Sequence, residues 1–252
     1  MKITENKVSC IIAAYNEGPR IGAVLSVISG SSIIDEIIVV NDGSNDNTRE
    51  IVEQYPNAQL VSYSQNKGKT FAVMTGLSRA KNDIVMLLDA DLVDLNYKDI
   101  ENLILPVVSG QADVSMSIWQ NSALPCKILG IDLESGQRVF YKKIIPDLKI
   151  LSKLPRYGLE VFINNIIVEK KLKLKIVNWD TVVAIRKSQK IGWWYGTFGD
   201  IKMTFQVVST IPLSTLIFQI KDLKSLSIDN LQTSKYRFYY KDIIPKISKI
   251  KF

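Results

Sequence analysis

Two aspartates, Asp89 and Asp91, stand at the end of an apolar run that begins at Ile84. Such a run is typical of a buried strand. Side chains two residues apart on an extended backbone point to the same side, so both carboxylates can reach one hard cation. A cation held by two protein carboxylates takes its other ligands from water and a substrate's phosphates. Taken alone, the pair fits a turn or a helix cap equally well.

Three earlier segments repeat this arrangement of an apolar strand, a polar tip with glycine, and a helix. A predicted strand over residues 8–14 is followed by a helix over 21–28. A strand over 36–40 is followed by a helix over 48–54, and a strand over 58–62 by a helix over 70–80. Alternating strands and helices form a mainly parallel sheet, whose ligands bind beyond the carboxyl ends of the strands. The sequence therefore predicts an α/β fold with four polar tips at one crevice. An acidic crevice with glycine turns suits a sugar nucleotide whose diphosphate is bridged by a metal.

Four segments in this order resemble the family 2 glycosyltransferases of the GT-A fold. They read VSCIIAAYNE, EIIVVNDGSNDNT, NKGKTFAVMTGL and DIVMLLDADL, and the resemblance covers roughly residues 7–115, with weaker similarity to about residue 195. It implies a Rossmann-like, mainly parallel sheet flanked by helices, to which we add a predicted C-terminal helical tail. It also implies transfer of a sugar from a nucleoside diphosphate sugar, with inversion at the anomeric carbon.

The same resemblance assigns roles to residues at the strand tips. Asp42 contacts the base or ribose, and Asp89 and Asp91 form the metal-binding DxD signature, with Asp91 the more direct ligand and Asp89 nearer the ribose. The other residues assigned to the nucleotide sugar are Ala14, Tyr15, Glu17 and Lys67. A solvated loop lysine is the ordinary alternative for Lys67. We predict that Asp46 caps the helix that follows it.

The second half of the chain carries looser motifs for the acceptor side. Residues 135–143 are similar to the SGFR-type segment of polyprenyl-phosphate sugar transferases, which implies that Arg138 pairs with a phosphate and that Gln137 lies beside it. An exposed arginine beside a strand is the alternative. Glu160 resembles a glutamate that opens a helix facing the acceptor pocket. It is our first candidate for a catalytic base, with Asp180 second, although a glutamate in a first helical turn is also ordinary.

The chain departs from the family at one position. Many relatives place a histidine that reaches the metal or diphosphate in a segment resembling residues 182–192, where our alignment puts Ala184. The chain contains no histidine. Metal binding must then rest on Asp89, Asp91, water and substrate oxygens, which favours Mg²⁺ or Mn²⁺ over zinc. The missing histidine also leaves open a degenerate metal site.

Length and composition fit one enzyme-sized domain with a tail. We expect a glycosyltransferase domain over residues 1–200, with a nucleotide-binding half (about 1–115) and an acceptor half (about 116–200), followed by a tail over 201–252. The two cysteines, Cys10 and Cys126, suggest reduced thiols rather than a disulfide framework. Residues 1–7 lack the apolar run of a secretory signal, so we expect a cytoplasmic active face.

Charge is divided unevenly along the chain. Residues 1–120 carry 9 Lys/Arg and 15 Asp/Glu, net −6, and residues 121–252 carry 23 and 10, net +13. No nucleic-acid motif accompanies the basic half, so we expect an anionic membrane surface or a lipid phosphate as its partner. The uncharged stretch 203–220 is too polar for a confident spanning helix, and the aromatic and basic segment 235–241 suits a headgroup region. We therefore predict peripheral attachment to the inner membrane face, with a simply solvated basic surface as the alternative.

The leading hypothesis is an inverting, metal-dependent glycosyltransferase whose acceptor is a polyprenyl phosphate or an envelope glycan. Residues 135–138, the basic second half and the C-terminal tail favour the lipid phosphate. A nucleotidyltransferase could share the sheet and the carboxylate pair, but the Gly-rich basic loop expected after the first strand is replaced by Tyr15, Asn16 and Glu17. A non-catalytic protein that binds sugar nucleotides is the third hypothesis, motivated by the missing histidine. Release of nucleoside diphosphate, with and without a divalent ion, separates the three.

Overall fold

The structure is a computed structural model of the 252-residue chain. It describes residues 7–122, 126–127, 130–133, 135–154, 158–184 and 213–228. Several predictions lie outside these residues: the proposed domain boundary near residue 200, most of the uncharged stretch 203–220, and the aromatic and basic segment 235–241.

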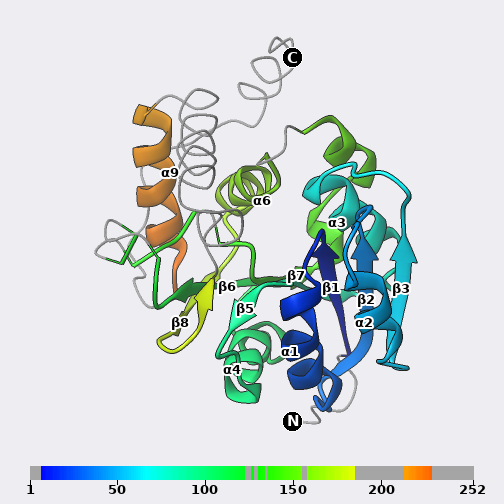
Figure 1. The fold of residues 1–252 in the computed structure, drawn as a ribbon. Coiled ribbons are helices and arrows are strands. Elements are labelled where there is room, and N and C mark those ends of the chain that lie inside the picture. The colour runs from blue at the N-terminus through cyan, green and yellow to red at the C-terminus, as the bar shows by residue number, and fades with distance from the viewer. Residues whose placement is uncertain are drawn as a thin grey trace.

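A seven-stranded sheet forms the centre of the molecule, in the order β3-β2-β1-β4-β7-β6-β8 (Figure 1). In this order the strands are β3 (Ala58–Ser62), β2 (Ile34–Asn41), β1 (Val8–Ala14), β4 (Ile84–Asp89), β7 (Arg138–Tyr141), β6 (Val114–Trp119) and β8 (Leu174–Trp179). All neighbouring strands are parallel except β7, which is antiparallel to both β4 and β6. The predicted mainly parallel α/β sheet is therefore confirmed.

Helices cover both faces of the sheet and enclose two cores. One face packs against α1 (Gly18–Ser29), α2 (Thr48–Glu53) and α4 (Tyr97–Val108), and the other against α3 (Lys69–Arg79) and α6 (Gly158–Glu169). Successive strand residues point to opposite faces. In β1, Cys10 and Ile12 accordingly belong to the first core and Ile11 to the second. Burial on both faces explains why β1 and β4 read as continuous apolar runs.

The antiparallel strand β7 decides which residues meet at the active edge of the sheet. Parallel strands β1, β2 and β4 all end at this edge, whereas β7 begins there, with Arg138 opposite Leu87. Residues 135–137 precede β7 and therefore arrive beside Asp89. Two 3-10 turns, η1 (Lys142–Ile144) and η2 (Leu148–Lys153), follow β7 before α6 begins.

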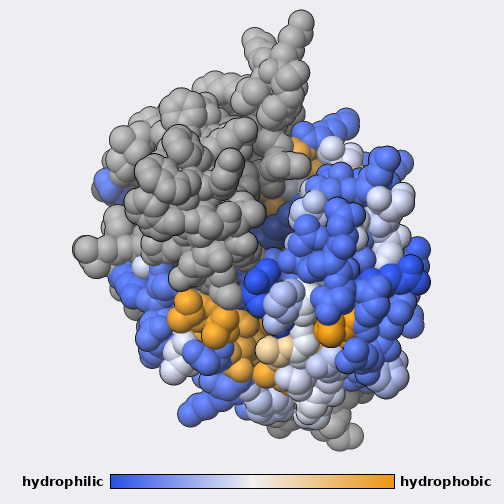
Figure 2. Space-filling view, viewed as in Figure 1, coloured by the Kyte–Doolittle hydropathy of each residue, from blue (hydrophilic) through white to orange (hydrophobic). Residues whose placement is uncertain are grey.

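A second, two-stranded sheet pairs β5 (Leu92–Val93) with β9 (Val183–Ala184). Figure 2 shows mostly hydrophilic residues on this face of the molecule, with apolar residues gathered around β5 and α4. Val93 and Leu105 are among the exposed apolar side chains of these elements.

The last described element is helix α9 (Leu213–Leu226), which packs against α6. Its Gln219 donates a hydrogen bond of 2.7 Å to Asn165 of α6. A C-terminal helix is thus present, as expected. Within the described parts of the chain, no helix has the length and apolar character needed to cross a membrane.

Candidate active site

Asp42, at the end of β2, joins this strand to the loop that opens α3. Its carboxylate is buried, and its two oxygens accept hydrogen bonds from the backbone amides of Lys67 (2.8 Å) and Gly68 (2.7 Å). The neighbouring Gly43 has a φ of 74°, and a β-carbon there would lie 2.6 Å from backbone atoms of the same loop. Asp42 therefore fixes where α3 begins. Its contact with a base or ribose stays a prediction.

The tip of β1 is bound to the turn before α2. Asp46 accepts hydrogen bonds from the backbone amides of Thr48 and Gly18, each 3.0 Å long, and so holds the first turns of both α2 and α1. Burial raises the pKa of Asp46, but the hydrogen bond from the Thr48 hydroxyl, together with the two backbone hydrogen bonds, outweighs it and leaves the pKa below its usual value. Asp46 thus makes the predicted capping contact, although Asn47 occupies the cap position itself.

Of the residues predicted at the tip of β1, only Tyr15 is prominently exposed, at 44%. Ala14 is buried, and its carbonyl accepts a hydrogen bond of 2.8 Å from the Asp42 amide. Glu17 is also buried and forms an ion pair of 2.6 Å with Arg20. Ala14 and Glu17 therefore stabilise the strand tip. Tyr15 is the solvent-exposed side chain of the three, and its contact with the nucleotide sugar stays a prediction.

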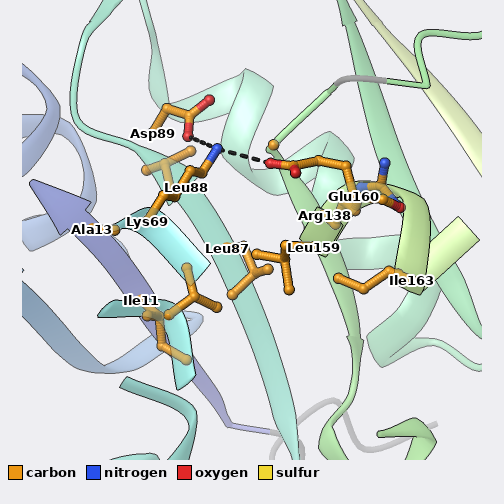
Figure 3. Close-up of a pocket in the computed structure, with 12 residues that line it drawn as sticks. Ile11, Ala13, Lys69, Leu87, Leu88, Asp89, Arg138, Leu159, Glu160 and Ile163 are labelled. Carbon is orange, nitrogen blue, oxygen red and sulfur yellow. Dashed lines mark hydrogen bonds and ion pairs between the residues drawn. The ribbon is translucent and has the colours of Figure 1, made fainter. Parts of the chain in front are cut away.

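The centre of the site is an ammonium group between two carboxylates (Figure 3). Lys69, the first residue of α3, lies 2.8 Å from Asp89 Oδ1 and 3.1 Å from Glu160 Oε1. Burial disfavours the charge on Lys69, but the two carboxylates more than offset it and raise the pKa of Lys69 above its usual range. The lysine is therefore protonated at neutral pH. The sheet, α3 and α6 each contribute one charged group.

Asp91 lies two residues beyond Asp89, in the turn between β4 and β5, and is half-buried. Leu92, which follows it, pairs with Ala184 of β9. The backbone of Ala184 therefore runs beside the DxD segment, where the resemblance expects a histidine. Among the described residues, no group of three or more His, Cys, Asp or Glu is arranged to hold a metal.

Arg138 lines the hollow around Lys69 (Figure 3), but its guanidinium is bound to protein groups. Its side chain is fully buried, and it donates hydrogen bonds to the carbonyls of Ser135 (2.9 Å) and Leu133 (3.1 Å) and to Asn164 Oδ1 (2.6 Å). Burial lowers its pKa to about 10, despite the opposing effect of Glu160 and Asp132. The predicted phosphate contact is corrected, because the guanidinium is committed to the loop before β7 and to α6. The alternative of an exposed arginine is equally wrong.

Gln137, predicted beside the acceptor, is also fully buried. Its Nε2 donates a hydrogen bond of 2.6 Å to Asp89 Oδ2, and its Oε1 accepts one of 2.6 Å from the indole of Trp119. The predicted acceptor contact of Gln137 is corrected as well, because its buried amide contacts the Asp89 carboxylate instead.

The two remaining predicted residues lie away from this centre. The ammonium of Lys67 lies over the rings of Tyr63 (4.6 Å) and Phe71 (4.8 Å). Asp180 is exposed after β8 and lies near Asp99, whose pKa is raised first by burial and then by the Asp180 charge. The hollow around Lys69 is lined by Glu160 but not by Asp180. Of the two candidate bases, the structure brings only Glu160 to Asp89.

Residues 9–124 match the sequence model described as Glycosyl transferase family 2. This segment belongs to that family. The poly-beta-1,6-N-acetyl-D-glucosamine synthase of Staphylococcus aureus (strain COL) is 33% identical over 135 residues, which are 51% of this chain and 33% of that protein. The Staphylococcus epidermidis synthase is 39% identical over 90 residues, 34% of this chain and 22% of that protein. The chain spans a third or less of the length of these curated relatives.

Solved structures show the same GT-A fold. Glucosyl-3-phosphoglycerate synthase from Mycobacterium tuberculosis, in complex with Mn²⁺, uridine diphosphate and phosphoglyceric acid, has a TM-score of 0.65 and 19% identity, covering 86% of this chain and 79% of that one. The same enzyme with Mn²⁺, UDP-glucose and phosphoglyceric acid has a TM-score of 0.59 and 21% identity, covering 72% of each chain.

Sequence reasoning missed two important residues of the site. The sequence indicates Lys67 rather than Lys69, and the one available signal for Lys69 is its position directly after Gly68, at the start of α3. Nothing in the sequence indicates Trp119, because the partner of its half-buried indole is set by strand order. Gln137 was named, but for the wrong contact.

Proposed function

We propose that this protein transfers a sugar from a nucleoside diphosphate sugar to an acceptor with inversion at the anomeric carbon. The observation that carries the proposal is the meeting of Asp89, Lys69 and Glu160 at the carboxyl edge of the sheet, of which β1, β2, β3, β4 and β6 lie in or at the start of the segment that matches family 2. Asp42 and Tyr15 lie at the neighbouring strand tips, where we place the base and ribose. Structural neighbours that bind uridine diphosphate and Mn²⁺ support this placement.

The oxygen ligands that Asp89 and Asp91 offer fit Mg²⁺ or Mn²⁺. Asp89 and Asp91 offer only carboxylate oxygens, which hard cations prefer. A protonated lysine 2.8 Å from Asp89 Oδ1 shows that this oxygen already favours a cation beside it. The bound ion would neutralise the charge of the departing nucleoside diphosphate. The protein's own contribution is to hold the two aspartates and to place Glu160 across from them.

We propose a hydroxyl acceptor, as on an envelope glycan. A hydroxyl nucleophile needs a base within hydrogen-bond reach, and Glu160 is the carboxylate in the hollow opposite Asp89. The buried Arg138 removes the main reason for preferring a lipid phosphate. The relatives named for poly-beta-1,6-N-acetyl-D-glucosamine synthesis agree with a glycan product. A polyprenyl phosphate, which needs no base, is the alternative acceptor.

We also propose that residues 1–200 form the transferase domain and that residues 201–252 attach it peripherally to the inner, cytoplasmic membrane face. The net charge of +13 in residues 121–252 supports this location, because basic residues are attracted to anionic lipid surfaces.

The proposal is tested by release of nucleoside diphosphate from a panel of sugar nucleotides, with and without Mn²⁺. We expect metal-dependent release from at least one donor, and none by Asp91→Ala. Binding of a donor without release in the presence of candidate acceptors would favour a non-catalytic protein, which Ala184 beside the DxD segment makes the second candidate. Pyrophosphate release from a nucleoside triphosphate and a sugar phosphate would instead indicate a nucleotidyltransferase.

A further inference from the structure

Two partners of different kinds contact the carboxylate of Asp89. Oδ1 lies 2.8 Å from the ammonium of Lys69, and Oδ2 accepts a hydrogen bond of 2.6 Å from Gln137. Lys69 is a charged group on a flexible stem, and its side chain is 38% exposed. Gln137 is a neutral amide with no exposed surface. One partner can move away, whereas the other is enclosed.

The direction of the Gln137 amide is fixed by its surroundings. An indole nitrogen can only donate a hydrogen bond, so Trp119 requires the oxygen of the amide on its side. The hydroxyls of Ser117 and Ser135 also lie 3.3 Å from this oxygen. The amide nitrogen must then face Asp89. A buried group that orients a metal-binding carboxylate in this way commonly affects metal affinity without touching the metal.

We infer that Gln137 is a positioning residue for Asp89, and that the hydrogen bond donated by the Trp119 indole orients the Gln137 amide. Gln137 holds Oδ2 in place, which leaves Oδ1 as the oxygen whose partner, Lys69, can be exchanged. A bound cation would compete with the mobile ammonium of Lys69 for Oδ1, because two positive charges cannot share this oxygen at low cost. The neutral amide experiences no such repulsion and stays. This inference rests on the proposed function, because it concerns the same carboxylate.

The test measures binding without turnover. Free Mn²⁺ is followed by electron paramagnetic resonance during titration of the full chain in saturating uridine diphosphate. We expect Gln137→Met, which keeps the length but loses the amide, to weaken Mn²⁺ binding by about 10-fold or more. Trp119→Phe should weaken it by a smaller factor. Because the indole acts through Gln137, the double variant should be no weaker than Gln137→Met alone.

Ser115→Ala is the matched control. Ser115 is buried on β6 like Ser117, but its hydroxyl bonds to the Leu103 carbonyl and not to Gln137. Removing it should change thermal stability and leave Mn²⁺ affinity unchanged. A second readout is the turnover number, which should return to within about 3-fold of wild type in Gln137→Met at saturating Mn²⁺, because a positioning residue does not react.

Three results would overturn the inference. The first is wild-type Mn²⁺ affinity in a folded Gln137→Met protein, or in Trp119→Phe should the first variant fail to fold. The second is additive losses in the double variant. The third is a wild-type chain that binds no Mn²⁺ with uridine, guanosine or thymidine diphosphate, and this result alone would overturn the proposed function as well.

Discussion

Replacing Gly136 by alanine tests whether the loop before β7 must approach Asp89 this closely. A β-carbon at Gly136 would lie 2.7 Å from Asp89 Oδ2, 2.8 Å from Oδ1 and 2.8 Å from Lys69 Nζ. Unbonded heavy atoms prefer a separation of about 3.5 Å, so the new methyl group must displace its neighbours by roughly 0.8 Å. Gly136 is not among the glycines with positive φ, so crowding is the main effect of the substitution.

The two neighbours respond differently to the methyl group. Lys69 can swing toward solvent, but Asp89 is a short side chain whose Oδ2 is held by Gln137. A shift of about 1 Å in a reacting group can lower the rate by about 100-fold. We therefore expect kcat/KM for the donor to fall by about 30- to 100-fold, which is about 2 to 3 kcal/mol. Crowding costs about 1 to 3 kcal/mol of stability, partly offset by about 0.4 to 1 kcal/mol from a less flexible unfolded chain.

The assay is release of nucleoside diphosphate at varied donor concentration, with thermal unfolding measured in parallel. Gly30→Ala is the matched control, because Gly30 ends α1 with a φ of −88° and has no atom within 4 Å of an added β-carbon. We expect the control to keep full kcat/KM. Wild-type kcat/KM in Gly136→Ala would refute the reasoning, since the carboxylate would then tolerate the displacement.

Four further predictions follow from the site and from the charge distribution. Asp91→Ala should abolish transfer with the fold intact by circular dichroism, and Asp89→Ala should weaken donor binding, measured by calorimetry, at least as much as turnover. With a hydroxyl acceptor, the pH–rate profile should show an acid limb that disappears in Glu160→Gln. With a lipid phosphate, the profile should be nearly flat from about pH 5 to 8 apart from the titration of the substrate phosphates, because the chain has no histidine. The pKa of Asp46 is lowered in the folded protein, so its ionised form stabilises the fold at pH values above the ordinary aspartate pKa of about 3.9. This stabilisation is lost as the pH falls through the lower pKa of the folded state. Asp46→Asn should therefore lower the free energy of unfolding by about 1 kcal/mol at neutral pH and change it little at pH 2. The full chain should sediment with anionic liposomes at low salt and not at high salt. Truncation after residue 230 should weaken this binding. Equal, negligible binding by the full and the truncated chain would contradict peripheral attachment.

The sequence predicts the first four strands and their polar tips well, because each strand is a short apolar run that ends in polar residues. The i, i+2 spacing of Asp89 and Asp91 follows from the extended backbone alone. The sequence does not reveal that β7 enters the sheet between β4 and β6 in the opposite direction. That insertion buries Gln137 and Arg138, and it explains why both were wrongly assigned to the acceptor. Strand order depends on the whole fold, so residue types along the chain could not supply it.

Lys69 shows how a functional position can break a local rule. A lysine at the start of a helix faces the positive end of the helix dipole, so local preference disfavours it there. The structure supplies the reason for its presence, because Asp89 and Glu160 each lie about 3 Å from its ammonium. These two carboxylate oxygens therefore lie no more than about 6 Å apart, and without Lys69 they would repel each other by about 3 kcal/mol or more at an effective dielectric constant of about 20. The lysine thus offsets the repulsion between Asp89 and Glu160. A conflict between local preference and observed position is expected where function sets the residue, and here it marks the centre of the site more directly than any motif.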